Sequence, residues 1–517
     1  MGPIGSRGQE HRRRGARSRR SGRPRPQAHR TPSRHSAGLP RQLGVLRQED
    51  LGLSPDRTCL PSTRGRGCGP PNRARTRDPP MTRLPQTRRH EGRAGATSSS
   101  ASPGSRSPKG VRDHSTPPAT LPHMTADSTI APISLVDLFA GCGGFTQGFH
   151  EFRPDGANAP VYRSVAAVEH DIAAASTYAL NFAKGAGGAD HIYAGDIEDW
   201  FPGPHEIQAE VILGGPPCQG FSGLGREDKD DPRNKLWRQY MRIVNTIKPK
   251  IFVIENVDRF LRSPEFAHLE SATQRGGELS EYEIVEKSVL NSADYGVAQA
   301  RRRAIVIAAH RDFKPLVPLK YPAPTHAKGV GADTSVLPGT ETRKPWVPVG
   351  PAVFSRTPFW ALNPSLPRGW YCNPLGTELP GPFATRDLHI GRRPTRLSVQ
   401  RYMAIPEGGN RHDLPPELST PNWLAHKSGS HDVMGRLYAD RPSVTIRTEF
   451  YKPEKGRYLH PQAHRPITHL EAALIQGFPE DFKWCGTKIQ IGRQIGNAVP
   501  VGLSRALAGS IYKALRG

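Results

Sequence analysis

The stretch Ile133-Ser-Leu-Val-Asp-Leu-Phe-Ala-Gly-Cys-Gly-Gly-Phe-Thr-Gln-Gly148 decides the fold. Its first seven residues form an apolar run that is typical of a buried strand. Gly141, Gly143 and Gly144 follow, and glycines at a turn let the backbone approach a ligand closely. A helix beginning there would offer free N–H groups at its N-terminus. The spacing differs from the GxGxxG of dinucleotide binders, and such a turn alone is weak evidence for a nucleotide-like cofactor.

Short apolar runs alternate with helical patterns beyond this stretch. The runs that predict further strands are 164–169, 211–214, 251–255, 282–290 and 304–310. Helices are predicted at 172–182 and 236–247, and later at 466–476 and 500–515. Alternation of this kind is typical of an α/β domain built on a mostly parallel sheet.

Acidic residues stand at the ends of two further strands. Glu169 ends the second strand, and Asp196 follows the third, directly after Ala194-Gly195. The carboxyl edge of an open α/β sheet is where ligands bind. Glu169 is suited to accept both hydroxyls of a ribose and Asp196 an adenine amino group, although helix capping or solvated loop ends would also explain them. Together with the glycine turn they favour an adenosine pocket.

Three more motifs carry groups suited to chemistry. In Gly214-Gly-Pro-Pro-Cys-Gln-Gly-Phe-Ser222 the two prolines stiffen the loop that holds Cys218, which suits a nucleophile that must be positioned. Glu255-Asn-Val257 ends a buried strand, where a carboxylate is costly unless paired or working. In Gln299-Ala-Arg-Arg-Arg303 an extended backbone would point Arg301 and Arg303 the same way.

This set of motifs resembles the cytosine-C5 DNA methyltransferase family, in the family's own order along the chain. Pro216-Pro-Cys-Gln219 resembles the catalytic loop, Glu255-Asn-Val257 the acidic motif, and Gln299-x-Arg-x-Arg303 the base-contacting motif. Gln494-Ile-Gly-Asn-Ala-Val-Pro500 resembles the last block, which in the family folds back beside the glycine turn. Three further blocks of the family have similar segments in this chain, at residues 231–236, 465–471 and 476–479. The resemblance therefore runs from about residue 133 to the C-terminus.

The resemblance implies a Rossmann-like methyltransferase domain that uses S-adenosyl-L-methionine and no metal. The implied catalytic residues are Cys218 as nucleophile at cytosine C6, Glu255 on the N3/N4 edge, and Arg303 with Arg301 at O2 or the loop. The implied cofactor-binding residues are Asp137, Phe139, Gly141, Gly143, Gly144, Glu169, Asp196, Ile197, Pro216, Asn497 and Val499. Because C5 is inaccessible within a duplex, the target base is expected to be flipped out, with the loop 219–226 closing over it.

Composition divides the chain further. Residues 1–123 hold 26 Lys and Arg against 7 Asp and Glu, with little apolar periodicity, so we expect a disordered basic leader over 1–129. It is either a DNA-holding arm or a stretch upstream of a true start at Met124. The catalytic domain is predicted at 130–310, a smaller irregular target recognition domain at 311–440, and a return to the catalytic domain at 441–517. The stretch 311–440 holds Trp346, Trp360, Trp370 and Trp423, and we expect most of its aromatic residues to form the core of the smaller domain.

The expected partner is double-stranded DNA, and the expected state is a monomer in the bacterial cytoplasm at the nucleoid. No apolar run is long enough to span a membrane, and the six cysteines show no metal spacing. A restriction-modification role with a cognate endonuclease is expected by analogy. Two alternatives are a cytosine-C5 methyltransferase acting on tRNA and a catalytically inactive DNA-binding homologue. Gly220-Phe-Ser222 favours DNA, and the retained nucleophile, acid and cofactor turn oppose an inactive scaffold.

Overall fold

The computed structural model describes residues 131–517 apart from 184–187, 204, 218–231, 330–342, 362 and 426–430, and gives only the backbone of 232–235. The predicted leader, Cys218 and the loop 219–226 therefore lie outside the described residues. The motif at 231–236 is described only in part. All other predicted site residues lie within the described part.

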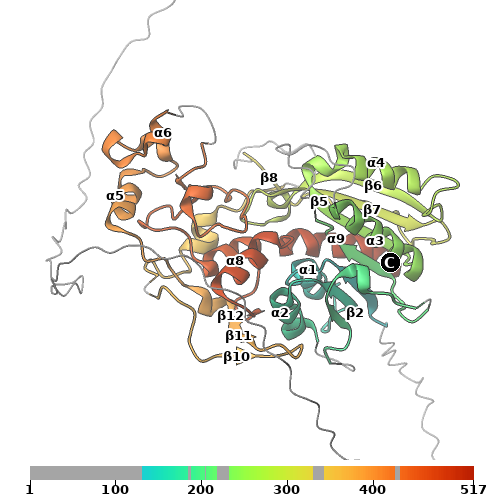
Figure 1. The fold of residues 1–517 in the computed structure, drawn as a ribbon. Coiled ribbons are helices and arrows are strands. Elements are labelled where there is room, and N and C mark those ends of the chain that lie inside the picture. The colour runs from blue at the N-terminus through green and yellow to red at the C-terminus, as the bar shows by residue number, and fades with distance from the viewer. Residues whose placement is uncertain are drawn as a thin grey trace, which may run out of the picture. The chain divides into compact units, whose positions relative to one another are not determined.

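A seven-stranded sheet runs through the described part in the order β3-β2-β1-β4-β5-β7-β6 (Figure 1). Its strands are β1 (Ile133–Leu138), β2 (Tyr162–Glu169), β3 (Ile192–Ala194), β4 (Val211–Gly214), β5 (Ile251–Val257), β6 (Tyr282–Asn291) and β7 (Arg302–His310). The strands from β3 to β5 are parallel, and β7 lies antiparallel between β5 and β6. The predicted α/β fold with a mostly parallel sheet is confirmed.

Helices cover both faces of this sheet, which explains why β1, β4 and β5 read as continuous apolar runs rather than alternating ones. One face packs on α3 (Pro232–Ile247) and α4 (Pro264–Ala272). The other packs on α1 (Gly144–Glu151) and α9 (Val501–Arg516). Ser504 Oγ on α9 donates to Phe145 O at 2.5 Å, so the last helix is fixed directly onto the first.

The helices begin where side chains cap them. Asp171 Oδ1 accepts from the N–H groups of Ala173 and Ala174 at the start of α2 (Ile172–Phe182). Thr468 and Thr487 begin α7 (His469–Gln476) and α8 (Lys488–Asn497) with capping boxes. The predicted helices at 172–182, 236–247, 466–476 and 500–515 all exist, and α7 begins later because Pro466 and Ile467 precede its cap.

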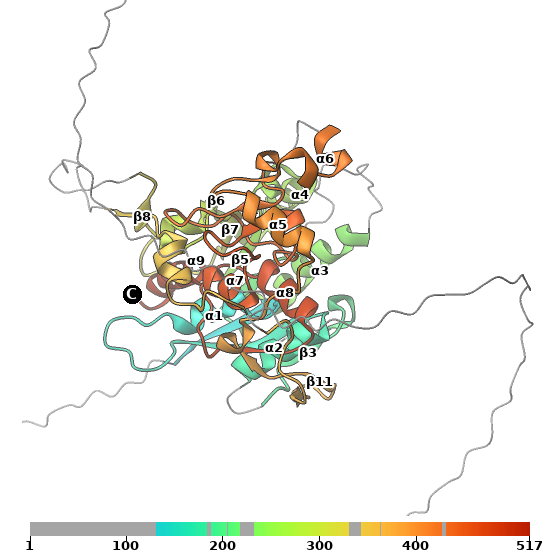
Figure 2. The same ribbon diagram turned by 90° about the vertical axis from the view of Figure 1, so that its left-hand side faces the viewer.

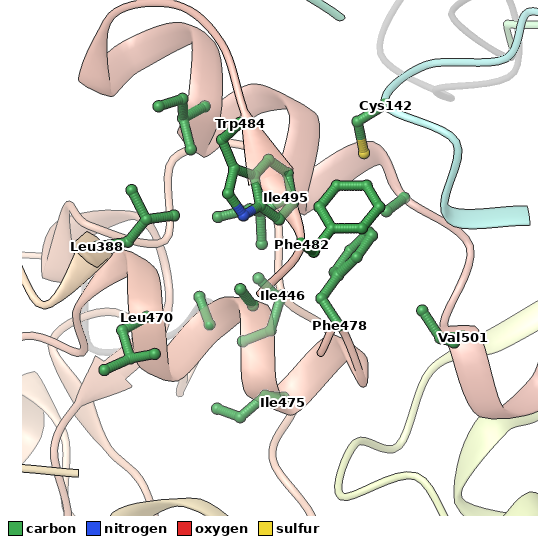
Figure 3. Packing of buried hydrophobic residues seen from close by; sticks show 14 of the residues in the cluster. Cys142, Leu388, Ile446, Leu470, Ile475, Phe478, Phe482, Trp484, Ile495 and Val501 are labelled. Carbon is green, nitrogen blue, oxygen red and sulfur yellow. The ribbon is translucent and has the colours of Figure 1, made fainter. Parts of the chain in front are cut away.

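A third apolar cluster joins α2 to the C-terminal helices. Figure 3 shows Cys142, from the glycine turn, pointing toward Phe478 and Phe482. Trp484, fully buried beside them, donates its indole N–H to Thr385 Oγ1 at 2.9 Å. Residues that lie more than 300 positions apart in the sequence thus share one core. The segment that contains Phe478 and Phe482 packs beside the glycine turn that contains Cys142.

The stretch between β7 and α7 has little regular structure. Its elements are the strands β8 (His326–Ala327), β9 (Lys344–Pro345), β10 (Tyr371–Cys372), β11 (Leu379–Pro380), β12 (Phe383–Ala384), β13 (Gly435–Arg436) and β14 (Arg457–Leu459), the helices α5 (Arg396–Ala404) and α6 (Pro421–Ala425), and short single turns; β15 (Lys483–Trp484) pairs with β12. In both views α5 and α6 lie away from α2 (Figures 1 and 2). They are associated with a small cluster of Tyr402, Ile405, Leu414, Met434 and Leu459.

The expectation that most aromatic residues of this stretch form its core fails for the tryptophans, although Phe383 and Tyr402 are buried. Trp360 is 60% exposed and Trp370 46% exposed. Trp346 and Trp423 are half-buried, the former donating to Asp294 Oδ1 at 2.8 Å and the latter lying under the Arg401 guanidinium. Of these four, Trp423 packs against the small cluster beside α5, but only from its edge, where it stays partly exposed.

The predicted domain limits stay a prediction. Phe313, Leu319 and Tyr321, which lie after position 311, pack on the core of the sheet. Val353 and Phe383 share the cluster that contains Tyr178 of α2. The two predicted domains therefore share apolar cores at these places. In the described ranges, no helix combines the length and apolar character needed to cross a membrane.

Candidate active site

A pocket of about 1110 Å³ opens at the carboxyl ends of the parallel strands. Thirteen of the predicted site residues line it: Asp137, Phe139, Gly141, Gly144, Glu169, Asp196, Ile197, Pro216, Glu255, Arg301, Arg303, Asn497 and Val499. Gly143 does not line the pocket, and Cys218 lies outside the described residues. Pro217, the residue before Cys218 in the sequence, does line it.

The glycine turn and Glu169 are joined by hydrogen bonds. Glu169 Oε2 accepts from the N–H of Gly141, and its Oε1 accepts from the N–H of Asp171, both at 2.8 Å. Burial raises the pKa of Glu169, while these two backbone donors oppose the rise. Each carboxylate oxygen has two lone pairs, so both oxygens can still accept from a ligand hydroxyl. A side chain at Gly141, where φ is +57°, would meet nothing within 4 Å, so the turn leaves open space.

Asp137 lies beneath the turn in a chain of hydroxyl contacts. Its Oδ2 accepts from Thr146 Oγ1 at 2.6 Å, and that hydroxyl lies 3.0 Å from Tyr178 Oη. Tyr178 Oη in turn lies 2.9 Å from Ser164 Oγ. Burial raises the pKa of Asp137 to about 7, against the opposing hydrogen bond from Thr146, and the nearby Glu169 adds to the rise. Asp137 therefore fixes the first turn of α1, which follows the glycine turn, through its bond from Thr146.

Asp196 performs the capping role that the sequence left open as an alternative. Its Oδ1 accepts from the N–H of Glu198 at 2.9 Å, beginning the short turn that carries the buried Ile197. The residue also lines the pocket, close in sequence to Gly195. Glu169, Asp171, Asp137 and Asp196 thus make this end of the pocket rich in carboxylates.

The C-terminal block lies against the glycine turn, as the resemblance implied. A Cβ added at Gly144 would stand 2.9 Å from both Ala498 Cβ and Val499 O, so only glycine permits this approach. A Cβ at Gly143 would stand 2.3 Å from the Phe182 ring, which places that residue against α2 rather than the pocket. Gly143 has a φ of +87° and begins α1.

The far end of the pocket carries a buried ion pair. Glu255, at the end of β5, lies with Oε1 2.8 Å from Arg303 Nε, and their side chains are 10% and 14% exposed. The two residues meet because β5 and β7 are antiparallel neighbours, with Val257 opposite Arg303. Asn256 Nδ2 donates to Pro216 O at 3.1 Å, which ties the start of the predicted catalytic loop to the same strand.

Arg301 has a different environment from Arg303. It is buried, and its Nη1 donates to Ile446 O at 2.8 Å and to Gly496 O at 3.0 Å. Burial lowers the pKa of Arg301 to about 9, Arg303 adds to the lowering, and Glu255 opposes it. The two arginines predicted to be catalytic therefore have different partners. The Arg303 guanidinium pairs with the Glu255 carboxylate, and the Arg301 guanidinium binds backbone carbonyl groups.

Two buried glutamines, which no sequence pattern marked as functional on their own, lie close to this ion pair and to Arg301. Gln299 Nε2 donates to Gln476 Oε1 at 2.7 Å, and Gln299 Oε1 accepts from the N–H of Ile446 at 2.8 Å. Both side chains are fully buried. Their only signal in the sequence was their place within two of the quoted motifs.

Comparison of the sequence with known proteins matches it to one family model and to curated members of the type II methyltransferases. The model of the C-5 cytosine-specific DNA methylase family matches residues 133–339 and 395–513. The type II methyltransferase M.XorII of Xanthomonas oryzae is 33% identical over 395 residues, which covers 74% of this chain and 85% of that protein. M.DdeI of Desulfomicrobium norvegicum is 30% identical over 394 residues, covering 73% and 88%.

A solved structure supports the fold. A prophage-encoded Escherichia coli protein, described as a DNA modification methyltransferase, superposes with a TM-score of 0.50 at 21% identity. The match covers 74% of this chain and all of the other.

Proposed function

Because this chain belongs to the C-5 cytosine-specific DNA methylase family and is a DNA (cytosine-5-)-methyltransferase, we propose that the pocket at the sheet edge holds both of its reactants. The carboxylate-rich end takes S-adenosyl-L-methionine, and the end with Glu255 and Arg303 takes a cytosine flipped out of double-stranded DNA. The observation that supports this most is the single pocket lined by residues from both groups of predicted site residues.

The residues at the first end fit the cofactor. Gly141 leaves open space above the turn, and Glu169 holds two oxygens beside it in a fixed orientation. Glu169 would accept the ribose hydroxyls, and Asp196 with Ile197 would hold the adenine. The carboxylates there suit a ligand that bears a positive sulfonium. When bound, the cofactor supplies an electrophilic methyl group.

The residues at the second end fit a cytosine ring. Glu255 would hydrogen-bond the N3/N4 edge and favour protonation at N3, which makes C6 more electrophilic. Arg303 holds the Glu255 carboxylate in place and balances its charge. Arg302 and Arg447, both exposed and both lining the pocket, would contact the phosphates beside the flipped nucleotide.

Cys218 is proposed as the nucleophile. Its thiolate would add to C6, so that C5 becomes nucleophilic and takes the methyl group. Loss of the C5 proton to a base or water then expels the thiolate and restores the aromatic ring. Asn256 would hold the loop through Pro216 O, which keeps the start of this segment beside Glu255.

The test is bisulfite sequencing of DNA from a methylation-free bacterial host that expresses the protein, with Cys218→Ser as the matched control. We expect full methylation at one short motif with the wild type and none with the variant. Unmodified DNA together with methylated tRNA would contradict the proposed DNA substrate and indicate that the substrate is RNA. Undiminished methylation by Cys218→Ser would show that the nucleophile is assigned wrongly.

We also propose that the protein acts as a monomer in a bacterial restriction-modification system. Relatives are named type II methyltransferases, and protection against a cognate endonuclease requires every copy of one short site to be modified. Methylation at a minority of the sites of a motif would oppose this role. The proposed place of action is the cytoplasm, where the nucleoid offers the substrate.

A further inference from the structure

The C-terminal end of α8 is followed directly by the pocket wall Asn497-Ala-Val499. A helix leaves its last carbonyl groups without partners inside the helix, so something else must bind them. The Ala498 N–H bonds Gln494 O at 3.1 Å, and Cys142 Sγ lies 3.7 Å from the same oxygen. The carbonyls of Ile495 and Gly496 need other donors.

Side chains from distant segments supply those donors. Gln476 Nε2, at the end of α7, donates to Ile495 O at 2.5 Å and to Ala498 O at 3.3 Å. Arg301 Nη1 donates to Gly496 O at 3.0 Å. Both side chains are buried, so water does not compete for these carbonyls.

We propose that Gln476 and Arg301 form a side-chain cap on α8 that positions Asn497 and Val499 for the cofactor. This makes Arg301 a positioning residue rather than a group that touches the base. The inference rests on the proposed cofactor pocket. It follows because a Cβ added at Gly144 would lie 2.9 Å from Val499 O, so the wall and the glycine turn approach closely and a shift of the wall changes the space beside the turn.

Gln299 provides a matched control for this cap. Its side chain donates to Gln476 Oε1 at 2.7 Å and accepts from the N–H of Ile446 at 2.8 Å, and neither of these two bonds involves α8. Gln476→Met removes the donors to α8, whereas Gln299→Met is the same substitution in the same buried cluster and leaves the cap in place. A purely structural role predicts similar losses from both variants.

The experiment measures binding of S-adenosylhomocysteine by calorimetry, binding of target duplex by anisotropy, and deuterium uptake over residues 488–499 in the free protein. Gln476→Met should weaken S-adenosylhomocysteine binding about tenfold, since each lost hydrogen bond contributes up to about that factor. Its uptake should rise over 488–499, and its affinity for duplex should stay within about twofold. Gln299→Met should leave S-adenosylhomocysteine affinity within about twofold.

Equal weakening by both variants would overturn the cap and leave only a shared structural role. Wild-type protein that fails to bind S-adenosylhomocysteine would instead overturn the cofactor assignment on which the inference rests. If Gln476→Met is insoluble, Gln476→Leu with Gln299→Leu as its control serves the same purpose, because leucine cannot donate to α8 and adds no buried charge.

Discussion

Replacing Glu255 by Gln should destabilise the protein more than replacing Arg303 by Met. Glu255 lies 2.8 Å from Arg303, and its charge also supports the ionised form of the buried Arg301. Glu255→Gln therefore leaves two buried guanidinium groups without this counter-charge, whereas Arg303→Met leaves Glu255 still beside Arg301. At an effective dielectric of about 20 the pair's direct attraction is roughly 6 kcal/mol, most of which offsets desolvation.

From these terms we expect Glu255→Gln to lower the free energy of unfolding by roughly 3–5 kcal/mol and Arg303→Met by about 2 kcal/mol. The assay is urea unfolding of the free protein at pH 7, followed by tryptophan fluorescence and circular dichroism. Coincident transitions are needed, because the described part contains several apolar clusters.

Glu281→Gln is the control, since Glu281 lies 2.7 Å from Lys248 but both side chains are about half exposed. It should cost less than about 1 kcal/mol, because solvent screens such pairs. A larger loss from Arg303→Met than from Glu255→Gln would refute the idea that one carboxylate serves both arginines.

Three further outcomes are expected. Gly141→Ala and Gly156→Ala should each cost about 1 kcal/mol, because both glycines have positive φ and open space, but only Gly141→Ala should abolish S-adenosylhomocysteine binding in calorimetry. Burial raises the pKa of Asp137 from 3.8 to about 7, so its contribution to stability is complete below pH 3.8 and is lost as the pH rises to about 7. Between these pH values the thermal unfolding midpoint should therefore fall more for the wild type than for Asp137→Asn. The affinity for target duplex should fall steeply with salt, with a slope of about −0.9 per phosphate contact, and equal affinity in low and physiological salt would oppose DNA binding.

The strands and the carboxylate edge could be predicted because burial on two faces leaves a direct mark on sequence. The run at 251–254 is apolar without alternation, which is what a strand covered on both sides requires. The places of Glu169 and Asp196 follow from the positions of these strands. Glu169 ends β2 and Asp196 comes soon after β3, and the two parallel strands end at the same edge of the sheet, where the pocket lies.

The contacts that join distant segments could not be predicted. Gln299 and Gln476 are 177 positions apart, and nothing in either local pattern identifies the other as its partner. Arg301 and Arg303 both line the pocket, but the partners that separate their environments come from other elements, which the local pattern does not identify. In the stretch after β7, short irregular segments give no period from which the exposure of Trp360 could be read.

The wall formed by Asn497 and Val499 has a consequence for synthesis of the protein. The glycine turn is translated more than 350 residues before the wall that closes its pocket, and α9, which packs on α1, comes later still. A nascent chain thus cannot complete its cofactor pocket before Val499 has been added, and any chain terminated before Val499 should be inactive. Methyl transfer then requires translation at least through Val499, so the delay between induction and DNA modification includes the time to elongate that far.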